Sequence, residues 1–237
     1  MEYQIYLKQL AAFKAQTSNK SVKCRLSQAI DLIDSLAQHD LPAEISAFNF
    51  SEQFIVDHLG DCPQIMDIDQ TLADLRQVVI ENFGLWHLFS KSWLNDLATF
   101  LAGKKTIQLM AGNAVIASFL DNVLAVDQLD WQGQDNQAPN PWTDVEQMDA
   151  LAAVKKYYLT TQAFILEWAP DFDQEDVKIL QFLRDHQWQG DFIVIGEYHG
   201  ATNSQAFWDL AHLTVPAALN INHPAIDFID DQVFIAS

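Results

Sequence analysis

The chain has 237 residues, of which 49% are hydrophobic and 11% aromatic, so its composition predicts a folded protein rather than a disordered one. Its 32 Asp and Glu outnumber 13 Lys and Arg, giving a formal net charge of −19. This charge argues against nucleic acid and against anionic membrane surfaces as partners, because both need clustered Lys and Arg.

The sequence offers no sign of membrane insertion or export. It contains no apolar run of about 18 residues, the length that a transmembrane helix needs. The first four residues include Glu2 and are not followed by the apolar segment of a secretory signal. The only cysteines, Cys24 and Cys62, form no disulfide framework, so we expect a cytoplasmic protein.

Residues 1–100 are predicted to form a helical N-terminal region. They contain few glycines, and their apolar residues recur at helical spacing, most clearly Leu26, Ile30 and Ile33. The expected helices cover residues 2–15, 26–37, 69–83 and 93–101. We expect this region to act as a cap that selects substrate or as the surface of a homodimer.

Residues 101–237 show a different pattern, in which short apolar runs alternate with helical stretches. The expected strands cover residues 106–110, 122–126, 145–148, 163–168 and 192–196. The helices between them are expected at residues 114–120, 151–158 and 175–186, with further strands at 214–221 and 225–235. This alternation predicts an α/β fold with a Rossmann-like, doubly wound, mostly parallel sheet. The Gln- and Pro-rich residues 132–141 form a loop.

Three candidate binding elements follow the first three expected strands. The first strand leads into a turn of small residues, which lets a ligand approach the backbone and the N-terminus of the next helix, for which Asn113 is the expected N-cap. Asp127 ends the second strand and is placed to bind a ribose diol, with Asp130 as a nearby competitor. Asp149 follows the third strand, where it accepts a hydrogen bond from an amine or caps the next helix. Alternatively, these are an ordinary tight turn and solvated acids.

In combination, these features resemble the class I S-adenosylmethionine-dependent methyltransferase superfamily, over about residues 82–237. The resemblance implies an antiparallel last strand, which residues 233–236 supply, and a cofactor site in the turn and at the two acids. The residues that correspond to this cofactor site are Met110, Ala111, Gly112, Asn113, Asp127, Asp149 and Ala150. The chain departs from the family pattern where Ala111 and Ala114 replace glycines and Gln108 replaces an acid.

The resemblance also places the methyl-transfer site after the fourth strand, at residues 166–170. Glu167 is the candidate general base there, and Trp168 is a candidate wall that stacks on substrate or adenine; otherwise Trp168 is core and Glu167 forms a cap or an ion pair. His199, in the loop after the fifth strand, is a candidate acid or base, or a solvated loop residue. Phe83 and Trp86 either cover the cofactor or pack the helical region against the sheet.

No metal is predicted. The seven histidines show no H-E-x-x-H or other paired ligand spacing. Asp171, Asp173 and Asp176 lack the glycine and the final acid of an EF-hand, so capping of the following helix is their expected role.

The sequence favours a methyltransferase that uses S-adenosylmethionine and acts on a small molecule or a protein, not on nucleic acid. The alternative is a catalytically silent methyltransferase-like scaffold used for binding or regulation, because the glycines are missing and no nucleophile is evident. A dinucleotide-dependent oxidoreductase ranks third, since its G-x-G-x-x-G turn is absent.

Overall fold

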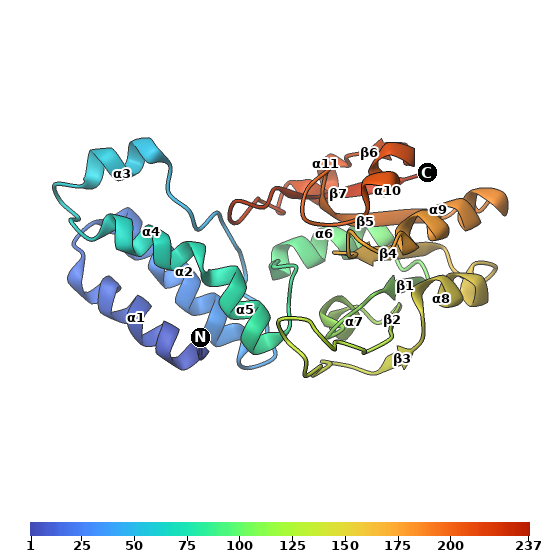
Figure 1. Cartoon of the computed structure of the whole chain (residues 1–237), viewed down its shortest axis with the longest axis horizontal. Coiled ribbons are helices and arrows are strands. Elements are labelled where there is room, and N and C mark those ends of the chain that lie inside the picture. The colour runs from blue at the N-terminus through green and yellow to red at the C-terminus, as the bar shows by residue number, and fades with distance from the viewer.

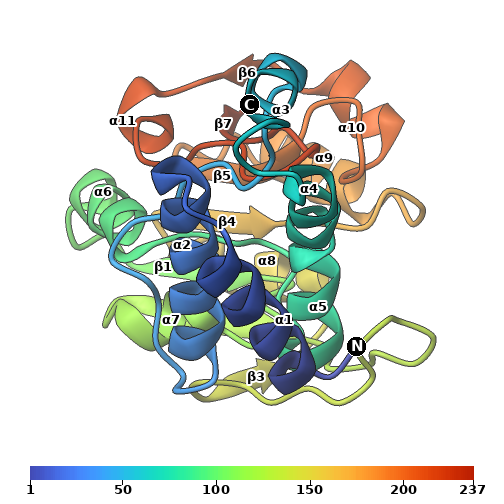
Figure 2. The ribbon, with the colours of Figure 1, turned by 90° about the vertical axis from the view of Figure 1, so that its left-hand side faces the viewer.

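The computed structural model describes residues 1–237, which form an elongated molecule with helices at one end and a sheet at the other (Figure 1). The N-terminal helices are α1 (Tyr3–Gln16), α2 (Lys20–Leu36), α3 (Glu52–His58), α4 (Ile65–Ala73) and α5 (Leu75–Phe83). Seen from that end, α1, α2, α4 and α5 lie in front of the sheet (Figure 2). The helix predicted at 69–83 is two helices that meet at Asp74.

The second part alternates strands and helices as the sequence predicts. Its elements in chain order are α6 (Lys91–Leu101), β1 (Thr106–Leu109), α7 (Val115–Phe119), β2 (Val123–Asp127), β3 (Val145–Gln147), α8 (Ala150–Tyr157), β4 (Ala163–Glu167), α9 (Glu175–Asp185), β5 (Asp191–Glu197), α10 (Gln205–Leu210), β6 (Leu213–Thr214), α11 (Ala217–Asn220) and β7 (Asp231–Ala236). No helix combines the length and the apolar character that crossing a bilayer requires.

The seven strands form one sheet in the order β3-β2-β1-β4-β5-β7-β6. Strands β1 to β5 pair in parallel, whereas β7 is antiparallel to both β5 and β6. The Rossmann-like α/β fold and its antiparallel last strand are therefore confirmed. The strand order reverses between β1 and β4, which is where ligands bind in open α/β sheets.

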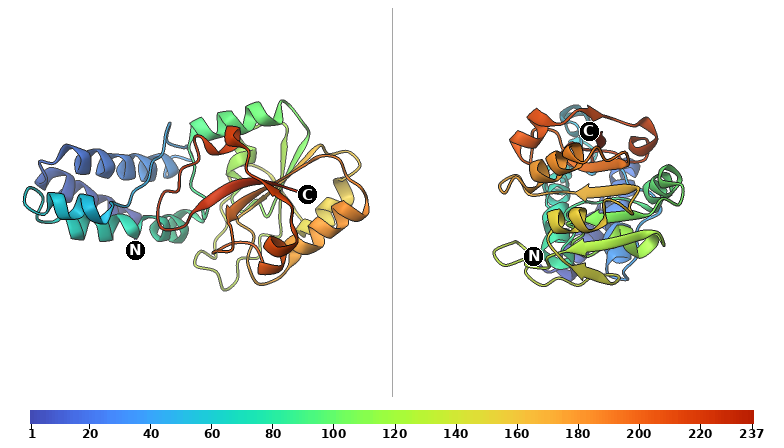
Figure 3. Two further views of the ribbon diagram at one scale, coloured as in Figure 1. Left: turned by 90° about the horizontal axis from the view of Figure 1, so that it is seen from above. Right: turned by 90° about the vertical axis from the view of Figure 1, so that its right-hand side faces the viewer.

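Alternating side chains along the strands build two layers of core. In β4, Ala163 and Ile165 join the cluster that contains Trp93 of α6, while Phe164 and Leu166 join the cluster on the opposite face. Figure 3 shows α6 on one side of the sheet and α8 and α9 on the other. This is the period-2 burial expected of strands covered by helices on both faces.

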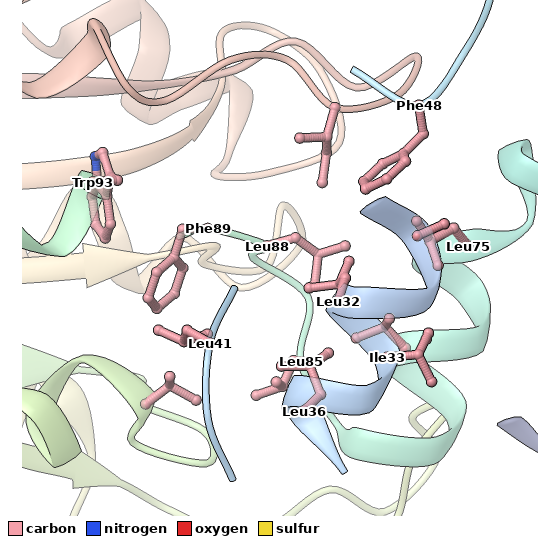
Figure 4. Packing of buried hydrophobic residues seen from close by; sticks show 14 of the residues in the cluster. Leu32, Ile33, Leu36, Leu41, Phe48, Leu75, Leu85, Leu88, Phe89 and Trp93 are labelled. Atoms are coloured by element: carbon pink, nitrogen blue, oxygen red, sulfur yellow. The ribbon is translucent and has the colours of Figure 1, made fainter. Parts of the chain in front are cut away.

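The larger core cluster continues from the sheet into the N-terminal helices. Figure 4 shows Leu32 and Leu36 of α2 beside Leu88 and Leu85 of the segment that joins α5 to α6. All four side chains are buried. The amphipathic stripe of α2 thus packs on this joining segment. This contact fixes the helical region against the sheet and holds the segment near the carboxyl ends of the strands.

The C-terminal tail differs from the prediction of two further strands. Only Leu213–Thr214 and Asp231–Ala236 are strands, and α11 forms where residues 214–221 were predicted to be extended. Pro216 stands at the N-cap position of α11, where its fixed φ favours helix entry rather than a continuing strand. Asn220 then joins α11 to β7 through hydrogen bonds with both the amide and the carbonyl of Val233.

Candidate functional site

A cavity of about 670 Å³ opens at the carboxyl ends of β1, β2 and β4. Its walls come from residues 84–87 of the α5–α6 segment, residues 110–113 after β1, Asp127 at the end of β2, and residues 167–173 after β4. Ligand pockets typically measure about 300–1,000 Å³, so the cavity is large enough for a nucleoside-sized molecule. It lies at the topological switch point of the sheet.

The turn after β1 adopts a backbone conformation that normally favours glycine. The φ angles of Met110, Gly112 and Ala114 are 51°, 53° and 56°, all in the left-handed region. For Met110 and Ala114 this conformation costs roughly 1–2 kcal/mol per residue. Two residues other than glycine thus hold a glycine-like turn, so the missing glycines do not abolish the bend that the sequence predicts.

Asn113 is not the N-cap of α7, contrary to the prediction. Ala114 occupies that position, and Asn113 is instead buried. Its Nδ2 donates to the Phe83 carbonyl oxygen at 2.7 Å, and its Oδ1 accepts from the Asn140 amide at 2.8 Å. Asn113 therefore ties the turn to the end of α5 and to the loop of residues 132–141, and both ends of its amide are already used.

Asp127 closes the turn from the side of β2. Its Oδ2 accepts from the Gly112 amide at 2.8 Å, and its Oδ1 accepts from the Leu129 amide at 2.6 Å. A carboxylate offers about four acceptor sites, so two remain for a ligand. Asp127 also lines the cavity, and so does Asp130.

Asp149 and Ala150 lie at the next strand end, where only Ala150 lines the cavity. Asp149 is the N-cap of α8, as expected, and its Oδ1 accepts from the Ala152 amide at 2.8 Å. Glu175 faces it from the start of α9 and also lines the cavity.

Asp149 and Glu175 shift each other's pKa in opposite directions. Burial raises the pKa of Glu175 to about 7, and the neighbouring Asp149 carboxylate adds to this. For Asp149, burial acts to raise the pKa, but the hydrogen bonds from Glu175 and the Ala152 amide outweigh it and lower the pKa. Of the two carboxyl groups, Glu175 therefore holds its proton to higher pH than Asp149 does.

Glu167 extends from the end of β4 into the cavity wall and is held at both oxygens. Oε1 lies 2.7 Å from Nδ1 of His87, and Oε2 accepts from Nε2 of Gln108 at 2.6 Å. Burial raises the pKa of Glu167 to about 7, while the hydrogen bond from Gln108 acts in the opposite direction. Gln108 is uncharged, so no second carboxylate repels Glu167 from that position.

Trp168 forms the adjacent wall and is fixed by polar contacts behind it. Its φ is 48°, and its Nε1 donates to Asp231 at 3.0 Å. The Arg76 guanidinium lies over its ring, 4.7 Å from the centroid. Backbone strain that surrounding contacts maintain is typical of functional sites, and Trp168 joins Met110 and Ala114 in this respect.

His199 is not brought to this site. It is exposed in the loop after β5, it does not line the cavity, and its Nδ1 lies 2.8 Å from Nε2 of Gln205.

The two aromatic residues before β1 divide between the predicted roles. Phe83 packs against Tyr3 with ring centroids 5.1 Å apart, whereas Trp86 lines the cavity beside Trp131.

Behind Glu167 and Trp168 lies a buried group that sequence reasoning missed: His87, His223 and Asp231. The two histidines are 136 positions apart, so no spacing motif could have found them. Burial lowers the pKa of His87 to about 4 and that of His223 to about 3, and in His223 the neighbouring His87 adds to the effect. Both rings are therefore neutral near pH 7.

No model of a known protein family matches the chain, and no curated protein sequence matches it. The chemistry of the cavity is therefore argued from its own geometry.

Proposed function

We propose that the chain is an S-adenosylmethionine-dependent methyltransferase that acts on a small molecule or a protein. The observation that carries this proposal is the hydrogen bond between Asp127 and the Gly112 amide, at the rim of a cavity at the switch point of the sheet. It brings a carboxylate with spare acceptor capacity beside a turn whose backbone is open to a ligand. The antiparallel last strand, which the resemblance implies, supports the same assignment.

We expect the cofactor to lie along the cavity in the order that the resemblance implies. Residues Met110 to Asn113 would bind the methionine part, Asp127 would accept from the ribose hydroxyls, and Ala150 would lie under the adenine. Asp149 is directed to its helix cap, so it reaches the adenine only through the Glu175 pair. The bound cofactor supplies an electrophilic methyl group.

The acceptor would bind between Glu167 and the aromatic walls of the cavity. Trp86, Trp131 and Trp168 all line it, and no Lys or Arg does. Glu167 would take the proton that a nucleophile loses, and the aromatic walls would exclude water from the transfer. A cavity with acidic and aromatic lining suits a neutral or cationic acceptor.

Isothermal titration with S-adenosylhomocysteine tests the proposal. We expect saturable binding to the unaltered protein and a loss of about 1–3 kcal/mol in Asp127→Ala, because a charge-assisted hydrogen bond is removed. That loss weakens binding by about 5- to 150-fold. Asp121→Ala is the matched control, because this exposed acid precedes the opposite end of the same strand. Equal affinity in the two variants would show that Asp127 does not hold the ligand.

A silent scaffold is the second candidate, and one observation favours it. The Gly112 amide and both ends of the Asn113 side chain already have partners within the protein, since Gly112 donates to Asp127 and Asn113 bonds to Phe83 and Asn140. Binding of S-adenosylmethionine without release of S-adenosylhomocysteine in the presence of acceptor mixtures would favour a sensor. No binding at all would favour a scaffold alone.

A further inference from the structure

The buried group behind the cavity consists of side chains from three separate segments. His87 lies between α5 and α6, His223 follows α11, and Asp231 begins β7. One ligand atom from each lies within 4.8 Å of the other two, and all three residues are buried. His87 also lines the cavity, but the convergence of the three side chains does not depend on the function proposed for that cavity.

The ring of His87 is oriented as that of a metal ligand is. Nδ1 of His87 lies 2.7 Å from Oε1 of Glu167, and its Nε2 points to Nε2 of His223 at 2.7 Å. A metal-binding histidine usually donates its second ring N–H to a carboxylate, which fixes the tautomer and leaves the other nitrogen as the ligand. Phe89 and Trp93 pack against these rings and form an apolar shell around them.

The local charge balance also favours a dication. Arg76 is the one cationic side chain beside the group, and it pairs with Asp227 and lies 3.8 Å from Asp231. The carboxylates of Asp227 and Asp231 thus outnumber the one guanidinium beside them. Buried carboxylates that exceed their cations are costly, and a bound divalent ion would offset this excess.

We propose that His87, His223 and Asp231 form a binding site for a divalent transition metal, best matched by Zn²⁺. Two imidazole nitrogens and one carboxylate oxygen suit Zn²⁺, whereas Ca²⁺ and Mg²⁺ prefer oxygen ligands throughout. Zn–N bonds of about 2.0–2.1 Å in a tetrahedral site place the two nitrogens about 3.3 Å apart, so the rings would separate by about 0.6 Å. Nδ1 of His223 has no hydrogen-bond partner that would resist this movement.

The ion would act structurally, by holding two residues of the cavity wall. It would fix His87, which contacts Glu167, and Asp231, which accepts from Trp168. It would also join the α5–α6 segment to β7, so we expect it to raise the thermal stability of the whole chain.

The test is the metal content of the untagged full-length protein, purified from zinc-supplemented cells and measured by mass spectrometry. We expect about one Zn²⁺ per chain, and a fall to background in His223→Gln, because a three-residue site that loses a ligand binds weakly. His58→Gln is the matched control, because His58 lies beside Asp61 in an exposed pair and should leave the metal content unchanged. Equal zinc content in His223→Gln and in the unaltered protein would overturn the proposal.

A second measurement does not depend on the folding of a variant. The unaltered protein, stripped with a chelator, is titrated with Co²⁺ and followed by visible absorption and by thermal unfolding. We expect the d–d bands of a four- or five-coordinate ion that saturate at about one equivalent, a rise in Tm, and displacement of the bands by Zn²⁺. No bands and no change in Tm would contradict the site, whatever the outcome of cofactor binding.

Discussion

Arg76 of α5 joins the N-terminal helices to the segment before β7, so its removal tests the packing of the two parts. The side chain is 5% exposed, and its Nε and Nη2 bind the two oxygens of Asp227 at 2.5 and 3.1 Å. Its Nη1 donates to the Trp86 carbonyl oxygen at 2.7 Å. The side chains of Asp227 and Asp231 are also buried, with exposed fractions of 8% and 2%.

Arg76→Met keeps the length of the side chain and removes its charge. It leaves two buried carboxylates without their cation, and breaking a buried ion pair in this way costs about 3–5 kcal/mol. We therefore expect the free energy of unfolding, measured by urea titration at pH 7, to fall by about 3–5 kcal/mol.

Two further variants separate the charge effect from the loss of packing. Arg25→Met removes a partly exposed arginine that lies over Phe50, and it should cost about 1 kcal/mol or less. Adding Asp227→Asn to Arg76→Met should restore part of the loss, because the direct partner of Arg76 then no longer carries a stranded charge. A loss below about 1 kcal/mol in Arg76→Met, or a double variant less stable than the single one, would refute the reasoning.

Three other predictions concern the rim of the cavity. Gly84 has a φ of 62°, and a Cβ there would lie 2.7 Å from the Trp131 ring, so Gly84→Ala should lower the unfolding free energy by about 1–3 kcal/mol; an unchanged urea midpoint would contradict this. Asn113→Ala leaves a carbonyl and an amide unpaired and should cost about 2–3 kcal/mol, whereas Asn95→Ala, at an exposed position of α6, should cost far less; equal losses would be inconsistent with the role of Asn113 in joining the turn to α5 and the loop. The raised pKa of Glu175, about 7 against an ordinary 4.5, means that the native state holds a proton that the unfolded chain releases, so stability falls as pH rises between these values. Glu175→Gln should remove that slope and, since the half-buried group is screened by solvent, gain about 1 kcal/mol at pH 8; parallel pH profiles for the two proteins would exclude it.

The architecture could be predicted because its signals are local. In β4, apolar residues run without interruption from Ala163 to Leu166, which is typical of a strand buried on both faces. The tail was harder, because the apolar residues of α11 occupy a single turn and show no helical period. The hydrogen bonds that hold that turn against β7 join Asn220 to Val233, which lies 13 positions away.

The site was predictable only where topology decides it. Parallel strands end at one edge, so Asp127 and Glu167 follow from the strand assignments. The left-handed conformations of Met110 and Ala114 could not be predicted, because neither residue favours them in isolation. Asn113 shows the same limit, since its partners lie 27 and 30 positions away. Because of these distant contacts, Asn113 joins two segments of the chain and does not cap the helix as expected.

A crystal structure of the protein with S-adenosylhomocysteine tests the central claim most directly. We expect the ligand across the carboxyl ends of β1 and β2, with its ribose hydroxyls on the Asp127 carboxylate and its amino-acid part along residues 110–113. A cavity that stays empty at saturating ligand, or a ligand bound away from Asp127, would contradict the methyltransferase assignment.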